Sequence, residues 1–571
     1  MKTYETDVLV IGGGGAATAA TISAHEAGAR TMLAVKGQFG VPGKRGSGAT
    51  SNPLADFWTI RTVGKKGGFF NPPEMVQRDM VQTGLGMADP ELCQIFVDEV
   101  SDALTRLQQM GMKFQSKMLA TMPANADTKT NHIVAIQKAV IAGTNTQVVE
   151  HANLTDLLVE SGRCVGAVGV DDEGQPFLIE AGAVILATGG VGQLFQYSFN
   201  PPGNTGDGYA MALRAGAELF NMEFMQQGLA TTFPTQAMVM LYEMAEPYRL
   251  LNAEGRTFVK EYLPDGVSLE EVSKLKAFHW PVSCRDAAIW LDVAIHGEVQ
   301  KGRATQNDAV FIDLSRAKRG FQPEMFLEYM HSVGIDVGQD LVQVQLHHHT
   351  SNGGVRIGPD TQTKVEGLFA CGETCGWQGA DRLGGTMLGG SQVFGWRAGK
   401  AAAQAAKARD VRRSRKEDLD RLVTAPVARY REQKGRHRPQ DLLPGLKRHM
   451  WLHLLVEKDA PSLQGVLQFI ADERDRLSHD LVIAEPFDLA LAFEHRNLLD
   501  VAEVIAQAAL RRTESRGSHF RSDFPKRNDQ KWLTNQFACR TEAGLVFENR
   551  WVSEKSGWID QPGDIRIKPW G

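Results

Sequence analysis

The chain has 571 residues, of which 43% are hydrophobic and 23% charged, with a formal net charge of −5. This length predicts several domains and a sizeable core. The balanced charge does not favour binding to nucleic acid or to an anionic membrane surface. No apolar stretch reaches the length of a membrane span, so we expect no transmembrane segment.

Six cysteines are scattered at positions 93, 164, 284, 371, 375 and 539, without a CxxC pair. This spacing supports neither an iron–sulfur cluster nor a disulfide framework. We therefore predict no metal site and a reducing compartment. The N-terminus is not a signal peptide but a strand entering a glycine turn, which favours the cytoplasm.

The strongest local pattern lies at the N-terminus. An apolar run over 7–11 leads into Gly12–Gly13–Gly14–Gly15, followed by a small-residue helix from Ala16 to Ala27. Gly12 allows the tight turn, and Gly14 lets a pyrophosphate approach the helix N-terminus. Ala17 is small enough for close packing of helix on strand. The order of strand, turn and helix predicts a dinucleotide-binding βαβ unit.

The second strand of this unit is predicted over 31–35 and is followed by Lys36, where an acidic residue often binds a ribose hydroxyl. That contact must therefore come from elsewhere. The small, basic segment 43–51 offers backbone N–H groups to a second phosphate oxygen or to the ribityl chain. A flexible loop is the alternative interpretation.

Further elements follow in order. Helical periodicity covers 73–112, and a strand pair over 146–150 and 164–170 precedes an apolar run over 183–186 that ends in Thr-Gly-Gly. That run is typical of a buried parallel strand returning to the cofactor sheet. Asp207, in Thr205–Gly208, opens a helix predicted over 209–215 and is either a helix cap or a cofactor contact.

The composition becomes irregular between 230 and 345, and the nucleotide-binding pattern then resumes with a strand before Gly372–Glu373 and a helix over 392–406. We therefore predict a Rossmann-like α/β domain with an inserted α+β capping domain. Charged residues over 407–418 suggest a solvated helix end or linker. Beyond 420, Leu498, Val501, Ile505 and Ala508 would line one helix face.

The predicted domains are a dinucleotide-binding domain in two parts, a cap between them, a helical domain and a C-terminal extension with Trp532 and Trp551, expected to be packed. Their predicted bounds are 1–233, 234–345, 346–410, 411–515 and 516–571.

Six motifs occur in a fixed order along the chain: VIGGGGAATAA at its start, ATGG at 187–190, TGDG at 205–208, GLFACGE at 367–373, GADRLGGTML at 379–388 and ESRGSHFRSDFP at 514–525. Together they resemble the flavoprotein subunits of the succinate dehydrogenase/fumarate reductase family, with L-aspartate oxidase and the α-subunit of adenylylsulfate reductase among the relatives. The resemblance covers essentially the whole chain. It implies FAD, a mobile cap, a three-helix domain and a C-terminal extension.

The resemblance also implies the FAD contacts, which come from the glycine turn, the 36–51 loop and three later segments. They are Gly12, Gly14, Gly15, Ala16, Ala17, Lys36, Ser47, Gly48, Ala49, Thr50, Asp207, Glu373, Met387 and Leu388. Several members bind FAD covalently through a histidine of this loop. No histidine stands between His25 and His132, so we expect non-covalent FAD.

Two residues match the family's substrate site. His349, in His349–Thr350–Ser351–Asn352–Gly353–Gly354, resembles the histidine that lies at the substrate carboxylate, and Arg382 resembles the arginine that holds a carboxylate from the other side. A guanidinium fork can pair a planar anion through two bonds. A structural role for His349 in a strand and a metal site both remain open, as does a structural pair of Arg382 with Asp381.

The family's catalytic arginine is harder to place. An alignment without gaps puts Met244 at that position, whereas matching Phe233–Pro234–Thr235 to the family's His-Pro-Thr puts Arg249 there. The histidine of that triplet is replaced by Gly228 or Phe233, respectively. This departure disfavours a standard succinate, fumarate or L-aspartate site.

From these residues we expect an enzyme, an FAD-dependent oxidoreductase that exchanges hydride with a small anionic organic substrate. Arg382 and His349 would supply charge, and Arg249, Glu246 or Tyr248 would handle the proton. The alternative is an adenylylsulfate-reductase-like protein that acts on a sulfur oxyanion or sulfonate with a ferredoxin-type iron–sulfur partner. A flavoprotein that only relays electrons within a complex is a third reading.

Overall fold

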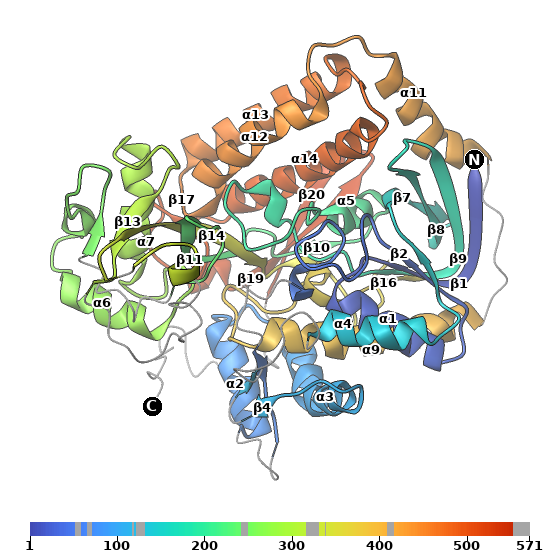
Figure 1. Cartoon of the computed structure of the whole chain (residues 1–571), viewed down its shortest axis with the longest axis horizontal. Coiled ribbons are helices and arrows are strands. Elements are labelled where there is room, and N and C mark those ends of the chain that lie inside the picture. Colours follow the sequence, from blue (N-terminus) through green and yellow to red (C-terminus); the bar gives the residue numbers. More distant parts are fainter. Residues whose placement is uncertain are drawn as a thin grey trace.

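A computed structural model of the chain describes residues 1–51, 59–64, 71–116, 119–121, 132–240, 249–315, 330–336, 338–407 and 416–551. A mixed sheet and its helices, an inserted sheet with two helices, and a group of long helices make up most of it (Figure 1). The predicted α/β class, with an inserted α+β region and a helical region, is confirmed. The exact domain bounds stay predictions.

The first sheet has seven strands in the order β6-β2-β1-β9-β8-β7, with β16 pairing the far end of β9. Strands β1, β2, β6, β9 and β16 are parallel, while β7 and β8 form an antiparallel hairpin. Their bounds are β1 Lys2–Ile11, β2 Thr31–Ala34, β6 Gln147–Val149, β7 Ala152–Glu160, β8 Arg163–Asp171, β9 Pro176–Leu186 and β16 Leu368–Ala370. The buried run over 183–186 does return beside β1, as predicted.

The predicted pairing of 146–150 with 164–170 is wrong. β6 instead pairs in parallel with β2, and β8 pairs with β7, which the sequence analysis did not identify. Ser161 and Gly162 adopt φ values of 50° and 80° between β7 and β8. Two successive residues with positive φ form the tight turn that right-twisted hairpin strands favour.

Helix α1 (Gly15–Glu26) packs between α4 (Ile133–Ala142) and α9 (Thr386–Lys407) on one face of this sheet (Figure 1). α9 begins six residues before the predicted start at Gln392. Its early glycines are held by packing, since a Cβ at Gly389 would lie 2.9 Å from Phe96. Tertiary contacts therefore override the low helix propensity of glycine.

The region predicted as helical over 73–112 contains two helices, α2 (Pro73–Thr83) and α3 (Pro90–Gln109). Asp89 separates them by capping α3, because its side chain accepts hydrogen bonds from the N–H groups of Glu91 and Leu92. A small sheet of β3 Ile60–Arg61, β5 Leu119–Thr121 and β4 Gln115–Ser116 belongs to the same part of the molecule (Figure 1).

The inserted region is organised on an antiparallel sheet in the order β11-β14-β13-β12. The strands are β11 Met225–Phe233, β12 Leu250–Leu251, β13 Val310–Asp313 and β14 Leu341–Ser351. Helices α6 (Leu269–Phe278) and α7 (Ile289–Gln300) belong to the same part of the molecule (Figure 1). β14 carries His349 and leads back toward the first sheet.

The helical region contains α10 Lys416–Leu419, α11 Ala425–Glu432, α12 Pro439–Met450, α13 Ala460–His479 and α14 Asp488–Arg511. Leu498, Val501, Ile505 and Ala508 of α14 are all buried, which confirms the predicted apolar face. α14 also packs against α5 (Asp207–Arg214), close to the cofactor sheet.

The C-terminal segment joins a sheet in the order β15-β10-β19-β20, and β18 pairs with β17. The bounds are β10 Leu219–Phe220, β15 Gly354–Val355, β17 Glu457–Lys458, β18 Phe520–Arg521, α15 Asp529–Trp532, β19 Thr534–Thr541 and β20 Gly544–Trp551. Trp532 is buried, as expected for a packed extension, whereas Trp551 is exposed.

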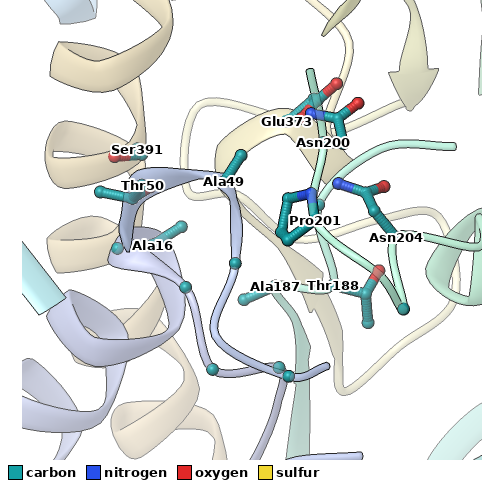
Figure 2. Close-up of a pocket in the computed structure, with 18 of the residues that line it drawn as sticks. Ala16, Ala49, Thr50, Ala187, Thr188, Asn200, Pro201, Asn204, Glu373 and Ser391 are labelled. Atoms are coloured by element: carbon teal, nitrogen blue, oxygen red, sulfur yellow. The ribbon is translucent and has the colours of Figure 1, made fainter. Parts of the chain in front are cut away.

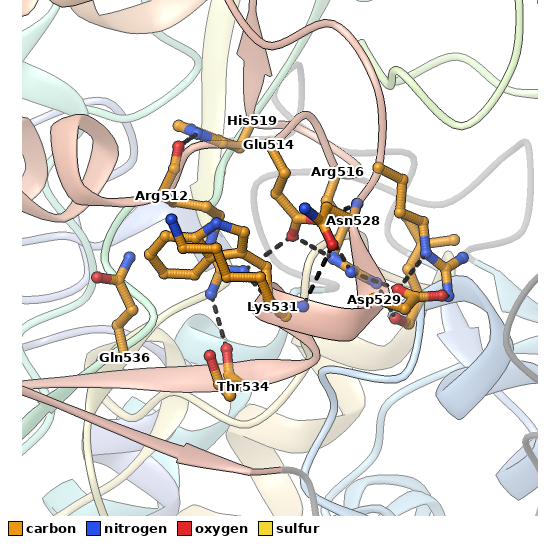
Figure 3. A network of polar contacts seen from close by, with 12 residues as sticks. Arg512, Glu514, Arg516, His519, Asn528, Asp529, Lys531, Thr534 and Gln536 are labelled. Carbon is orange, nitrogen blue, oxygen red and sulfur yellow. Dashed lines mark hydrogen bonds and ion pairs between the residues drawn. The ribbon is translucent and has the colours of Figure 1, made fainter.

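A buried ionic network holds this extension (Figure 3). Glu514 accepts from both Arg512 (3.0 Å) and Arg516 (2.7 Å), and Arg516 also reaches Asp529 (2.5 Å). The adjoining turn touches two other regions, because Gly517 O accepts from Cys284 N–H at 2.8 Å and Ser518 N–H donates to Ala380 O at 3.2 Å. The extension therefore braces the residue just before Asp381 and Arg382.

Candidate functional site

A pocket opens where the parallel strands β1, β2, β9 and β16 end (Figure 2). Ligands of open α/β sheets bind at this carboxyl edge. Twelve of the fourteen predicted cofactor residues line the pocket, and they are Gly12, Gly14, Gly15, Ala16, Lys36, Gly48, Ala49, Thr50, Asp207, Glu373, Met387 and Leu388. Ala17 lies behind it, buried in α1, and the Ser47 hydroxyl is turned to the Lys44 carbonyl at 2.6 Å.

The glycine turn leaves its backbone open to the pocket. Gly12 has φ +129°, and a Cβ there would lie 2.2 Å from the Ala187 carbonyl oxygen. At Gly14 the only atom near a Cβ would be Gly48 Cα, at 3.6 Å, so the space beside Gly14 belongs to the pocket. The first N–H groups of α1 have no intrahelical acceptors and can bind an anion here.

Lys36 and Asp207 form an ion pair at the edge of this pocket. Lys36 Nζ lies 2.5 Å from Asp207 Oδ2 and 2.7 Å from Glu494 Oε1, on α14. Burial pushes the pKa of Asp207 upward, but Lys36 and hydrogen bonds from Asn497 and Thr205 outweigh it, so this pKa lies below its usual range. Gly206, not Asp207, is the N-cap of α5.

Asn204 is among the residues that line the pocket (Figure 2). The open glycine cradle and the N–H groups at the start of α1 fit a dinucleotide.

Arg382 and His349 meet at the other end of the same pocket. Arg382 Nε donates to Gln226 Oε1 at 3.1 Å, and Arg382 Nη2 lies 3.2 Å from His349 Nδ1. Burial, followed by the charge of Arg382, holds the pKa of His349 well below its usual range. His349 Nδ1 lies 3.2 Å from both Arg382 Nη2, which only donates, and Gln226 Oε1, which only accepts, so the neutral ring makes one of these two hydrogen bonds at a time.

Glu373 lies between the two ends. Its Oε1 accepts from Thr350 Oγ1 and from the Ser351 N–H, both at 3.0 Å, and burial raises its pKa. A Cβ at Gly190 would lie 2.2 Å from the same oxygen, which explains the second glycine of Thr-Gly-Gly.

Arg249 is placed elsewhere. Its Nη1 lies 2.6 Å from Asp313 Oδ2 and donates to Ser315 Oγ at 3.1 Å, and Arg249 is not among the residues that line the pocket. Glu246, Tyr248 and Met244 lie outside the described residues. The structure thus brings His349 and Arg382 together, but not Arg249, whose catalytic role stays a prediction.

The sequence analysis missed two residues that form polar contacts at the Arg382 end of the pocket, Gln226 and Arg285. Gln226 Oε1 accepts from Arg382 Nε at 3.1 Å and lies 3.2 Å from His349 Nδ1. Arg285 Nη2 lies 2.9 Å from Asp381 Oδ2, which also accepts from Ser283 Oγ at 2.5 Å. Asp381 is therefore paired with the inserted region. No local pattern marks these residues, because their partners are distant in sequence.

Comparisons with known proteins agree with this geometry. The family model described as FAD binding domain matches residues 7–388, and the model described as fumarate reductase flavoprotein C-term matches residues 444–555. The chain belongs to the succinate dehydrogenase/fumarate reductase flavoprotein family. Its cofactor is FAD, and it is an FAD-dependent oxidoreductase.

Individual relatives are similar over nearly the whole length. An uncharacterised FAD-dependent oxidoreductase of Methanocaldococcus jannaschii is 31% identical, with 93% of this chain and 96% of the relative covered. A fumarate reductase (CoM/CoB) subunit of Methanothermobacter marburgensis is 32% identical, with 92% and 95% covered. The solved Sdh1 complex of Mycobacterium smegmatis with UQ1 has a chain with TM-score 0.82, 25% identity and coverage of 97% and 96%.

Within the described ranges, no group of three or more His, Cys, Asp or Glu residues is arranged to hold a metal ion. No helix in the same part of the chain combines the length and apolarity of a membrane span.

Proposed function

We propose that this oxidoreductase exchanges hydride between FAD and a carbon–carbon bond next to the carboxylate of a small organic anion, with succinate and fumarate as poor substrates. The observation that carries the proposal is Arg382, 9% exposed, at the far end of the pocket that begins at the glycine turn. A cation at this position would face a substrate that lies against the flavin.

The residues that would hold FAD are the glycine turn, the 48–50 loop, the Lys36–Asp207 pair and Glu373. When bound, FAD supplies the two-electron chemistry, and the protein binds and orients the substrate. We propose non-covalent binding, because no histidine lies between positions 25 and 132. Acid precipitation should release all flavin into the supernatant, and flavin retained in the washed pellet would refute this.

Arg382 would pair the substrate carboxylate through its planar fork. The neutral His349 ring lies 3.2 Å from the same guanidinium, and together with Gln226 it holds that guanidinium in place. In the reduction direction, hydride adds to the β carbon, a proton adds to the α carbon, and two C–H bonds replace the π bond. For the proton we propose Glu246 or Tyr248, and Arg249 only if it leaves its ion pair with Asp313 during turnover.

The relatives named above include a protein whose name describes it as one subunit of an enzyme. We therefore propose an electron partner, with a ferredoxin-type iron–sulfur protein as the first candidate. A sulfur oxyanion or sulfonate substrate is the second candidate function to be tested in the same assay.

Anaerobic photoreduction of the holoenzyme tests the proposal. Reoxidation of the flavin by an α,β-unsaturated carboxylate, with formation of the saturated acid, is the expected result. Reoxidation only by adenylyl sulfate would support the second candidate, and reoxidation only by an iron–sulfur protein would support an electron relay. Either outcome would overturn the main proposal.

A further inference from the structure

A small apolar cluster lies beside the Arg382 end of the pocket. Phe199, Ala230 and Val239 form a buried group separate from the main core, with Trp280 packed against it. Phe199 itself lines the pocket. The ring centroids of Phe199 and Trp280 lie 5.5 Å and 5.0 Å from that of His349, both edge-on. The wall next to the carboxylate clamp is therefore aromatic.

Trp280 occupies the space of a missing side chain on β11. A Cβ at Gly228 would lie 2.3 Å from Trp280 Cζ2, and the indole N–H donates to the Leu229 carbonyl at 3.1 Å. Gly228 is one of the two positions that replace the family's His-Pro-Thr histidine. The other, Phe233, is 52% exposed at the end of β11. Gly228 lies on β11 opposite His347 of β14, and an aromatic ring fills the space that a side chain at Gly228 would take.

The charges at this end suit one carboxylate. Among the described residues that line the pocket, Arg382 is the cation here, and Lys36 is paired with Asp207 and Glu494 at the other end. The His349 ring is neutral, and Glu373 adds a carboxyl group of its own. Among the described residues a second substrate carboxylate would find no further cation, and its loss of water against Phe199 would be costly.

We propose that the substrate is a monocarboxylate with an apolar or aryl group, which Phe199 contacts while Arg382 pairs the carboxylate. This inference rests on the proposed function and names its substrate class. Phe199 contacts the substrate, and Trp280 is a positioning residue that acts through Phe199 and His349.

Calorimetric titration of the oxidised holoenzyme tests the ligand class by binding alone. We expect 3-phenylpropanoate to bind at least about 100-fold more tightly than succinate, the scale for leaving one charge buried and unpaired. Equal affinity, or tighter binding of succinate, would overturn the inference.

Reoxidation of the photoreduced flavin by cinnamate, crotonate and fumarate tests the chemistry separately. If fumarate reacts faster than the other two, the proposed function stands and the substrate class fails. If 3-phenylpropanoate binds but no enoate reoxidises the flavin, the chemistry fails and the ligand class stands. Faster reaction of cinnamate and crotonate supports both.

The variant Trp280→Ala tests the wall. It should weaken 3-phenylpropanoate binding about tenfold, the upper range for an aromatic pair, and leave succinate binding unchanged. Trp280→Phe should restore most of the preference, and Phe233→Ala, at the exposed position, is the matched control. An equal loss for both ligands in Trp280→Ala, with flavin retained, would show that Trp280 only supports the fold and would overturn its assignment.

Discussion

The two ends of the pocket are built in different ways. The dinucleotide end is mostly backbone, with Gly12–Ala16 following one strand and a second glycine-rich loop at Gly48 closing over it. The Arg382 end consists of side chains from four segments, with Phe199, Gln226, His349 and Arg382 meeting only in the folded chain. Backbone N–H groups recognise the pyrophosphate, which every dinucleotide carries. The side chains at the Arg382 end would recognise one particular substrate.

This difference predicts which positions tolerate amino-acid substitution. A glycine turn that serves as an anion site tolerates little change, because any Cβ meets either the chain or the ligand. The side chains around Arg382 carry no such backbone constraint, and the space of a residue-228 side chain, for example, is filled by Trp280.

The largest expected effect comes from Gly14→Val. A Cβ at Gly14 meets only Gly48 Cα at 3.6 Å, so the apoprotein should fold normally. The added methyl groups would occupy the place of the pyrophosphate, and flavin binding should be abolished. The flavin absorbance of the purified variant and its thermal unfolding check this.

Gly465→Val in α13 is the control, because nothing lies within 4 Å of a Cβ there. It should keep a full complement of flavin. If Gly14→Val also retained flavin, the pyrophosphate would not lie at the N-terminus of α1.

At the other end, Arg382→Ala should leave bound FAD in place and weaken binding of the substrate monoanion by roughly 1.5–3 kcal/mol, the range for a charged hydrogen bond. Arg382→Lys keeps the charge but loses the planar fork and should fall in between. Titration of the oxidised holoenzyme measures both. Flavin loss with unchanged ligand affinity would assign Arg382 to the cofactor or the fold.

The dinucleotide end could be predicted from the sequence because its signals are local. The order of strand, glycine turn and small-residue helix stands within the first 28 residues, and twelve of the fourteen predicted contacts line the pocket. The buried face of α14 was predicted for the same reason, since Leu498 and Val501 follow helical spacing.

What could not be predicted depends on tertiary packing. β6 pairs with β2, and α9 starts at Thr386 through two glycines held against Phe96 and Trp377. Motif matching found His349 and Arg382 but not Gln226 or the indole over Gly228. Their partners are distant in the sequence, and such contacts leave no local pattern from which they could be predicted.

The buried histidines of β14, beside the Arg382 end, should make the folding stability depend on pH. His348 stacks on Phe195 at 4.9 Å, and burial lowers its pKa to about 3. The unfolded chain takes up a proton below about pH 6.5, whereas the folded ring stays neutral until about pH 3. The contribution of His348 to the unfolding free energy is therefore fully present above about pH 6.5 and decreases as the pH falls toward 3.

Between pH 7.5 and 5 this one ring should cost about 2 kcal/mol of unfolding free energy. Denaturant unfolding of His348→Leu should show a pH-dependent loss smaller by that amount. His479→Asn, whose side chain is 74% exposed, is the control. The same pH dependence in His348→Leu and the unmodified chain would show that the His348 ring is not the neutral, buried group described here.

The smallest effect is expected for Arg249→Ala, which tests the residue that motif comparison places at the Arg382 end. The Arg249 guanidinium is held by Asp313, in an ion pair that is partly exposed to solvent. Such pairs contribute about 1 kcal/mol or less, so the unfolding free energy should barely change. On the same scale kcat/KM should fall less than about fivefold, with Asp313→Ala as the matched control. A loss of about 10²–10⁴ in Arg249→Ala alone, the range for a proton-transferring group, would instead make Arg249 the residue that handles the proton. It would also require the inserted region to swing Arg249 away from Asp313 and toward Arg382 during turnover.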